Sequence, residues 1–304
     1  MTSQLLIKER TTLANKYCLK KINENYLSKM EASGTCLELI GDWQHDISRI
    51  AENFRNATPY ESIVIDNFLD PVYAEQIYNQ FPTDFDNWHK YENPIEVKYA
   101  FDNIDTLPKD VMNYFYLLSS EHVKNLVSRI SGIEDLEYDE YLHGAGLHAH
   151  PRNGRLNIHL DYEKHPYSGK ERRVNVILFM TKDWKKEWNG ANELWNSQVS
   201  ECMKKTEVKF NRAIIFKTND TTWHGLPDKI KCPENIFRKS LAYYYVSPLK
   251  SEKREESYRT KAQFVKRPND IYDQGINELY KIRPYRRIEP EDLMKHTPEW
   301  NTES

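Results

Sequence analysis

The chain has 304 residues and a formal net charge of −3, with 29% charged and 39% hydrophobic residues. This length is enough for one sizeable core or two small ones, and the composition is that of a polar globular protein. The nearly balanced charge excludes an electrostatic case for nucleic acid as the main partner.

The cysteines and the N-terminus predict a protein of a reducing compartment. Cys18, Cys36, Cys202 and Cys232 are scattered and form no C-x-x-C pair, so we interpret them as reduced thiols. The first residues lack the apolar run of a signal peptide, and no stretch approaches the 18 apolar residues of a membrane span. We therefore expect a cytoplasmic protein with no membrane contact.

The first part of the chain is predicted to be largely helical. Residues 1–58 are rich in Lys, Glu and Asn and are interpreted as a helical N-terminal extension. The segment 61–70 then predicts a short strand that runs into a turn. A helix follows, because Asp70 is suited to cap its N-terminus and Pro71 to occupy its first turn.

A second helix is expected over about residues 108–131. Gly132 is a plausible stop for it, since glycine adopts the left-handed conformation that ends many helices. The apolar positions lie on roughly one stripe, formed by Val111, Phe115, Leu118, His122 and Ile130.

From about residue 136 the pattern changes to short alternating segments, which predict strands. They are separated by Gly, Asn, Asp and Pro, and they cover 155–161, 172–180, 192–196, 206–210, 212–217 and 238–246. Helices followed by antiparallel strands predict a mainly β fold, with a jelly-roll or β-sandwich core and N-terminal helices.

The change in composition after Pro248 predicts a third segment. Residues 59–250 would form the central domain, and the strongly charged residues 251–304 a peripheral C-terminal extension. Two roles stay open for this extension, since it would either cover a site or bind a partner.

A candidate metal site lies in the strand RLNIHLD. Side chains alternate between faces along a strand, so Asn157, His159 and Asp161 share one face while the other is wholly aliphatic. Of the ten histidines, only His159 has an acid two residues on, although about one or two such pairs arise by chance. Non-haem iron takes two His and one carboxylate, and His224, delivered by the apolar strand 212–217, is the best candidate for the third ligand.

A candidate anion site lies fourteen residues after His224. In 238–246, alternation places Arg238 and Ser240 on one face. A guanidinium binds a carboxylate through two parallel hydrogen bonds, and the hydroxyl adds a third. An inward Arg among apolar side chains is unfavourable without an anionic ligand; the alternative is an edge strand with Arg238 in solvent.

This ordered set, H-x-D, a distal His and R-x-S, resembles the iron(II)- and 2-oxoglutarate-dependent oxygenases, in particular their prolyl 4-hydroxylase-like branch. The similarity runs from about 61 to 247 and includes IVIDNFLDPVYAEQI, GRLNIHLD, RRVNVILFMTKDWKKEWNGANELWN and VKFNRAIIFKTNDTTWHGLP. It implies a double-stranded β-helix, an enzyme that hydroxylates unactivated C–H bonds, and the use of Fe(II), 2-oxoglutarate and O2, with ascorbate as a candidate reductant.

The resemblance also implies roles for single residues. His159, Asp161 and His224 match the iron ligands. Arg238 matches the partner of the distal carboxylate, and Ser240 the hydroxyl that assists it.

Further positions match the pocket less closely. Asn175 falls on an inward position that lines the co-substrate pocket in this branch. Phe179 replaces a frequent pocket tyrosine, and Asn189-Gly190-Ala191 replaces the usual Gly-Gly turn. Upstream, His143, His148 and His150 lie close to the site, and His148 is expected beside iron, co-substrate or substrate without binding the iron.

The substrate is left open among an amino acid, a prolyl residue of a peptide and a glycan-type metabolite. Two alternatives to the oxygenase are a non-catalytic protein on the same fold and a cupin-like metal protein that does not use 2-oxoglutarate. The second has no need for Arg238 and Ser240, which favour the oxygenase.

Overall fold

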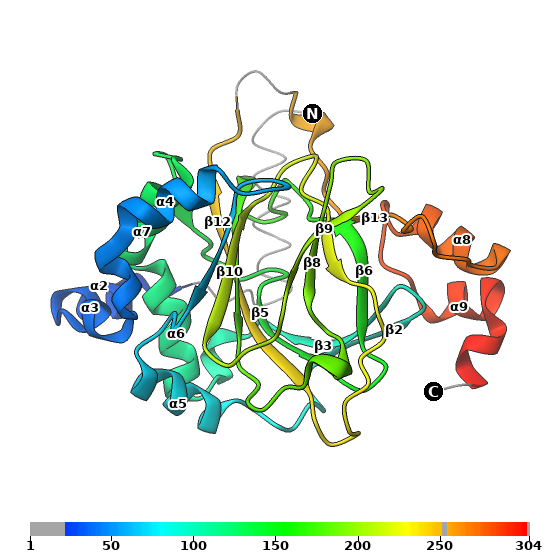
Figure 1. Cartoon of the computed structure of the whole chain (residues 1–304), viewed down its shortest axis with the longest axis horizontal. Coiled ribbons are helices and arrows are strands. Elements are labelled where there is room, and N and C mark those ends of the chain that lie inside the picture. Colours follow the sequence, from blue (N-terminus) through cyan, green and yellow to red (C-terminus); the bar gives the residue numbers. More distant parts are fainter. Residues whose placement is uncertain (1–21, 251–253, 303–304) are drawn as a thin grey trace.

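The computed structural model describes residues 22–250 and 254–302. In this part of the chain, one antiparallel sheet curls into a nearly closed, jelly-roll-like barrel (Figure 1). The predicted fold class, mainly β with N-terminal helices, is confirmed. The predicted limits of the three segments stay a prediction.

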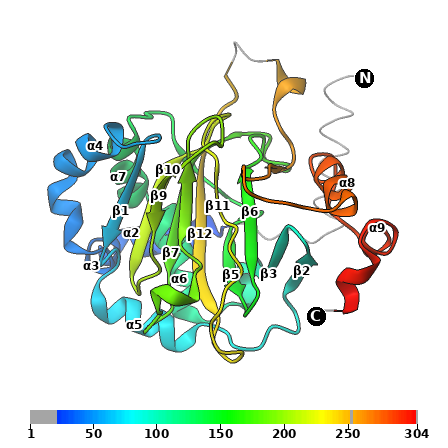
Figure 2. The ribbon, with the colours of Figure 1, turned by 45° about the vertical axis from the view of Figure 1, so that its right-hand side comes forward.

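The helices lie on two sides of the barrel (Figures 1 and 2). The N-terminal group comprises α2 (Glu24–Ala32), α3 (Thr35–Leu39), η1 (Asp42–Asp46), α4 (Ile47–Arg55), α5 (Pro71–Gln80), η2 (Ile104–Thr106), α6 (Lys109–Ser119) and α7 (Glu121–Ser131). The short 3-10 helix η3 (Lys186–Trp188) lies in a connection between two strands of the barrel. The C-terminal group comprises α8 (Gln274–Ile282), α9 (Pro290–His296) and η5 (Pro298–Thr302) on the far side, and η4 (Glu255–Ser257), which lies above the barrel in these views.

The strands follow the order β1-β10-β7-β12-β5-β3-β6-β11-β8-β9, with β2 paired to β3, β4 to β12 and β13 to β6. Their bounds are β1 (Ser62–Asp66), β2 (His89–Asn93), β3 (Glu96–Phe101), β4 (Glu137–Tyr138), β5 (Gly146–His150), β6 (Arg155–Leu160), β7 (Glu171–Phe179), β8 (Asn192–Trp195), β9 (Cys202–Thr206), β10 (Arg212–Lys217), β11 (His224–Leu226), β12 (Arg238–Ser247) and β13 (Gln263–Phe264).

Alternation along the central strands separates the core from the pocket. On β12, Leu241, Tyr243 and Tyr245 belong to the hydrophobic core that also holds the buried side chains of α4 to α7. The residues between them point to the other face, where Arg238 and Ser240 line a cavity. The same division holds on β5 and over residues 174–178 of β7, as period-two geometry requires, whereas a bulge in the β7–β12 pairing also brings Arg172 to the cavity.

Two core tyrosines fix the sheet against the end of α6. The Tyr245 hydroxyl donates to the Leu118 carbonyl at 2.6 Å, and the Tyr243 hydroxyl lies 2.8 Å from that of Ser119. A buried hydroxyl needs such a partner. These bonds therefore define how β12 lies against the helices.

The helix predicted over 108–131 is two helices, so that expectation is wrong. Ser120 takes an extended conformation (ψ 149°), ends α6 and caps α7 by accepting a hydrogen bond from the Val123 amide at 3.3 Å. Competition from serine side chains for backbone groups favours such a break. The predicted stop is confirmed, since Gly132 has φ 69° at the end of α7.

The strand predicted over 206–210 is also wrong. The strand is β9, which ends at Thr206, and the following residues turn into β10. Asn211 has φ 57°, and the Arg212 amide donates to the Lys209 carbonyl at 3.1 Å. Residues 207–210, which were assigned to the strand, belong to this connection between β9 and β10.

The structure also bears on the predicted N-terminal extension, the cysteines and the absence of a membrane span. Residues 22–58 carry α2 to α4, and the rest of the predicted N-terminal extension, with Cys18, lies outside the described residues. Cys36, Cys202 and Cys232 are free thiols. Every described helix is too short or too polar to span a bilayer.

The cap of α5 gives a test of the local fold. Asp70 accepts from the amides of Val72 and Tyr73 at 2.9 and 3.0 Å. We expect Asp70→Ala to lower the free energy of unfolding by about 1 kcal/mol, measured by urea denaturation. Asp70→Asn keeps an acceptor and should lose less; equal losses in the two variants would contradict the role of this cap.

Candidate metal centre and its pocket

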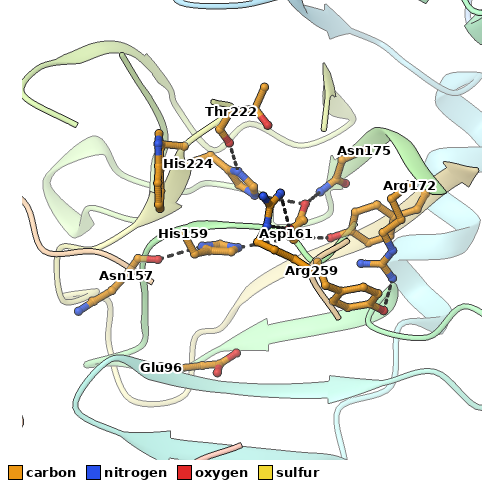
Figure 3. A network of polar contacts seen from close by, with 12 residues as sticks. Glu96, Asn157, His159, Asp161, Arg172, Asn175, Thr222, His224 and Arg259 are labelled. Atoms are coloured by element: carbon orange, nitrogen blue, oxygen red, sulfur yellow. Dashed lines mark hydrogen bonds and ion pairs between the residues drawn. The ribbon is translucent and has the colours of Figure 1, made fainter. Parts of the chain in front are cut away.

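Three potential ligands converge from neighbouring strands. His159 lies on β6, Asp161 follows that strand directly, and His224 begins β11, which pairs with β6 so that the two histidines stand opposite each other. The donor atoms of all three lie within 4.8 Å of one another. Each Nε2 faces one carboxylate oxygen of Asp161, at 3.7 Å from His159 and 3.6 Å from His224 (Figure 3).

Backbone carbonyls set the tautomer of both histidines. Nδ1 of His159 lies 2.9 Å from the Asn157 carbonyl, and Nδ1 of His224 lies 2.9 Å from the Thr222 carbonyl (Figure 3). A carbonyl only accepts, so each Nδ1 carries the proton and each Nε2 keeps its lone pair. That is the state in which imidazole binds a metal.

Electrostatics also keep His224 and Asp161 in their ligating forms. Burial and the nearby His159 lower the pKa of His224 to about 4, so this ring is neutral at pH 7. Burial would raise the pKa of the Asp161 carboxyl, but His224, His159 and Arg172 together hold it below its usual range. The donor set therefore fits a divalent metal of the two-His, one-carboxylate type.

The Asp161 carboxylate is held from the opposite wall. The Tyr244 hydroxyl donates to one oxygen at 3.0 Å and the Asn175 amide donates to the other at 3.2 Å. Asn175 thus lines the pocket, as expected, but it contacts the acidic ligand. Tyr244 shares its face of β12 with Arg238 and Ser240, and the sequence did not indicate its contact with Asp161.

A cavity of about 290 Å³ adjoins the three ligands, and Arg238 and Ser240 line it. Arg238 is 1% exposed. Its Nε donates to the Gly190 carbonyl at 2.7 Å, and its guanidinium lies 4.8 Å from the centre of the Phe179 ring. Phe179, which replaces a common pocket tyrosine, therefore supports the arginine through its ring.

The guanidinium of Arg238 has an unfilled hydrogen-bonding capacity. Its Nη2 is buried without a partner, and no described carboxylate lies within ion-pair distance. Burial lowers the pKa of Arg238 to about 9. Such a group favours an anion as its ligand.

The turn before β8 contacts Arg238. Sequence analysis did not indicate this contact. Asn189 and Gly190 both have positive φ, 61° and 83°. A Cβ on Gly190 would lie 3.1 Å from Cδ of Arg238. Glycine is needed here both for its backbone conformation and for the space beside the arginine.

Two of the three predicted pocket histidines lie on β5, beside the face of β12 that carries Arg238 and Ser240. His148 pairs with Ser240 and His150 with Arg238, and both rings line the cavity. Burial, together with the positive charges of Lys98 and Arg238, lowers the pKa of both histidines. They are neutral at pH 7 and stand apart from the three converging ligands.

A second buried arginine lines the same cavity. Arg172 is sandwiched between Tyr162 and Tyr244, whose ring centres lie 3.7 and 3.6 Å from its guanidinium carbon. It also donates to the Tyr162 hydroxyl and to the His143 carbonyl. By contrast, Trp195 and Trp223 pack with Ile158 and Leu160 on the outer face of β6.

The C-terminal extension covers the metal centre, so it is not merely peripheral. Phe264 stacks on the His159 ring at 5.1 Å between ring centres. Asn157, on the same strand, donates to the hydroxyls of Tyr272 and Tyr280 at 3.0 and 2.7 Å. Arg259 lies over Asp161, 3.4 Å from its carbonyl oxygen (Figure 3).

Residues 145–246 match the model of the 2OG-Fe(II) oxygenase superfamily. This segment contains all three converging ligands and Arg238. The expected resemblance is therefore confirmed for this segment, which matches a superfamily of 2-oxoglutarate-dependent oxygenases. No curated protein sequence matches the chain.

Several solved structures are similar in part. A prolyl hydroxylase from Trichoplax adhaerens, in complex with a hypoxia inducible factor peptide, has 17% identity and a TM-score of 0.49, over 68% of this chain and 94% of that one. A prolyl-4-hydroxylase from Pseudomonas putida has 13% identity and a TM-score of 0.47, over 67% and 100%. HygX from Streptomyces hygroscopicus, with nickel, 2-oxoglutarate and hygromycin B, has 10% and 0.43, over 64% and 85%.

The lowered pKa of His143 predicts that the protein loses stability in acid. Burial and the nearby Arg172 lower the pKa of His143 from 6.5 to about 3. Between these values the unfolded chain binds the extra proton, so stability is present above pH 6.5 and falls as the pH drops towards 3. His143→Gln should lose less stability than the natural protein between pH 6.5 and pH 4, in urea titrations of the metal-free chain; an identical loss would contradict this.

Proposed function

We propose that the chain is an iron(II)- and 2-oxoglutarate-dependent hydroxylase in which His159, Asp161 and His224 hold the metal. Arg238 binds the distal carboxylate of 2-oxoglutarate, and Ser240 assists it. The observation that carries this assignment is the buried Arg238 guanidinium, which faces the cavity with a free Nη2 and no carboxylate beside it.

The chain's own residues would bind and orient the reactants. With iron(II) and O2, 2-oxoglutarate supplies oxidative decarboxylation to succinate and carbon dioxide, coupled to hydroxylation of a C–H bond. Tyr244 and Asn175 hold the Asp161 carboxylate in place, and Phe264 shields the His159 ring from water. His148 borders the co-substrate beside Ser240.

The intact acid at Asp161 favours hydroxylation, because the related halogenases lack this carboxylate so that chloride can bind. An amino acid, a prolyl residue of a peptide or a glycan-type metabolite would be the substrate, with ascorbate as a reductant. The alternative, a metal protein of the cupin type that does not use 2-oxoglutarate, gives Arg238 nothing to bind.

Removal of a metal ligand should abolish turnover. Residues that only support a metal ligand typically lower metal affinity or activity roughly 10- to 100-fold when they are replaced. We expect His159→Ala and Asp161→Ala to lower both iron affinity and succinate release by more than this. Succinate release should require both iron(II) and 2-oxoglutarate. Unchanged turnover in either variant would exclude the assigned ligands.

Loss of Arg238 should mainly weaken 2-oxoglutarate binding. We expect Arg238→Met to raise the KM for 2-oxoglutarate at least about tenfold, because charge-assisted hydrogen bonds are lost. The visible charge-transfer band of the anaerobic iron complex should require correspondingly more 2-oxoglutarate. A cupin-type protein would give no such band in either form.

A matched pair of glycine variants separates this effect from backbone strain. Gly190→Ala places a methyl group against Arg238, whereas Gly132→Ala has a similar φ of 69° and no atom within 4 Å of the added Cβ. Both variants should lose stability. Only Gly190→Ala should raise the KM for 2-oxoglutarate, and equal KM values would argue against Arg238 as the anchor.

A further inference from the structure

The entrance of the cavity is lined by positive charge. Lys261, Arg283 and Arg287 come from the C-terminal extension and Lys98 comes from β3, while Glu96 is the acid among them. These entrance residues differ in exposure from Arg238, since Lys261 and Arg287 are exposed and Arg238 is buried. A co-substrate bound at Arg238 therefore leaves the entrance charges available.

Glu96 compensates only part of this charge. Its carboxylate lies 3.2 Å from the Lys98 ammonium and 3.3 Å from the Arg283 guanidinium, and all three side chains are buried. One negative charge is thus shared between two positive charges. The three residues together leave a surplus of one positive charge.

Lys261 and Arg287 add to that surplus. Within residues 22–250 and 254–302, neither has a carboxylate at ion-pair distance. Arg287 instead lies 3.2 Å from Nε2 of His89 and 5.4 Å from the centre of the Tyr91 ring. Its guanidinium keeps donors that are not used by a fixed acid.

The positive groups also act on one another. Burial, and then Arg287 and Arg283, lower the pKa of Lys261. Like charges held together at a pocket entrance attract anions, and their mutual repulsion is relieved when an anion binds. Asp102, whose carboxyl pKa is raised by burial and lowered by Arg287, offsets part of the charge of Arg287.

The entrance charges lie beside the metal ligands. The Arg283 guanidinium is 5.0 Å from the centre of the Phe264 ring, and that ring stacks on His159. Lys261 and Thr260 precede this phenylalanine by a few residues and line the same cavity. The entrance charges and the three converging ligands line one cavity, so a molecule that fills this cavity contacts both.

We propose that the primary substrate carries an anionic group, a carboxylate or a phosphate, which Lys261 and Arg287 bind at the entrance while the C–H bond to be oxidised lies at the metal centre. This deepens the proposed function and rests on it. Arg287 suits either anion, since a guanidinium donates two parallel hydrogen bonds to both. Among amino acids, peptides and glycan-type metabolites, this entrance site selects substrates that carry an acidic group.

Small probes test the site while the natural substrate is unidentified. The full chain is loaded with iron(II) and saturating 2-oxoglutarate without oxygen, and methylphosphonate is titrated in at low salt. Binding is followed by phosphorus-31 relaxation, which the paramagnetic iron enhances. Trifluoroacetate, followed by fluorine-19 relaxation, distinguishes a carboxylate preference from a phosphate preference, and the neutral dimethyl ester of methylphosphonate is the uncharged control.

The double variant Lys261→Gln/Arg287→Gln should bind the preferred anion about tenfold or more weakly. Lys266→Gln/Lys281→Gln removes the same charge from exposed positions of the extension outside the cavity, and should bind it as the natural chain does. Equal binding by the first variant, or binding of the neutral ester as strongly as the anion, would overturn the proposal.

Failure of the proposed function has a different signature. In that case the charge-transfer band with 2-oxoglutarate would not form. The same titration on the metal-free chain, followed by phosphorus-31 line width, would still show whether Lys261 and Arg287 bind the anion. A band that forms without anion binding at these residues would overturn only the substrate proposal.

Discussion

The alternation of side chains along β5, β12 and most of β7 is the constraint on which the site depends. One face of these strands is apolar and packs against α4 to α7, and the other carries the polar groups of the cavity. A slip of one residue would place Arg238 in the helical core. The hydrogen bonds of Tyr243 and Tyr245 to the end of α6 oppose such a slip, so the helical layer fixes the register of the site.

The same wall supports both halves of the site. β12 carries Arg238 at one end and Tyr244 six residues further on, and Tyr244 holds the carboxylate of Asp161. The anion anchor and the support of the acidic ligand are therefore parts of one strand. This links the distance between metal and anion to the backbone geometry of β12, which loops at the rim do not alter.

Sequence patterns predicted the elements whose signal is local. β10 is a continuous apolar run, whereas β6 and β12 have an alternation that placed His159, Asp161, Arg238 and Ser240 on inward faces. β3 was missed because Glu96 and Lys98 do not look like core residues, yet they are buried as an ion pair with Arg283. β5 was missed because its glycine and alanine give only a weak strand signal.

The parts of the site that escaped prediction depend on distant residues. Phe264 contacts His159 from more than a hundred residues away, and nothing in its own neighbourhood indicates that contact. The amphipathic stripe over 108–131 fits one long helix or two short ones. The side chain of Ser120 caps the second helix and so produces the break between α6 and α7. The roles assigned to the ligands and to Arg238 stay predictions that the geometry supports.

The position of the C-terminal extension has a consequence for how the enzyme is made. During synthesis, the strands that carry His159, Asp161 and His224 emerge before the residues that cover them. On the ribosome, the strands that carry the three ligands can pair before Phe264 and Arg259 are free to pack over them. The three ligands are then less covered than in the complete chain, which favours metal entry at that stage.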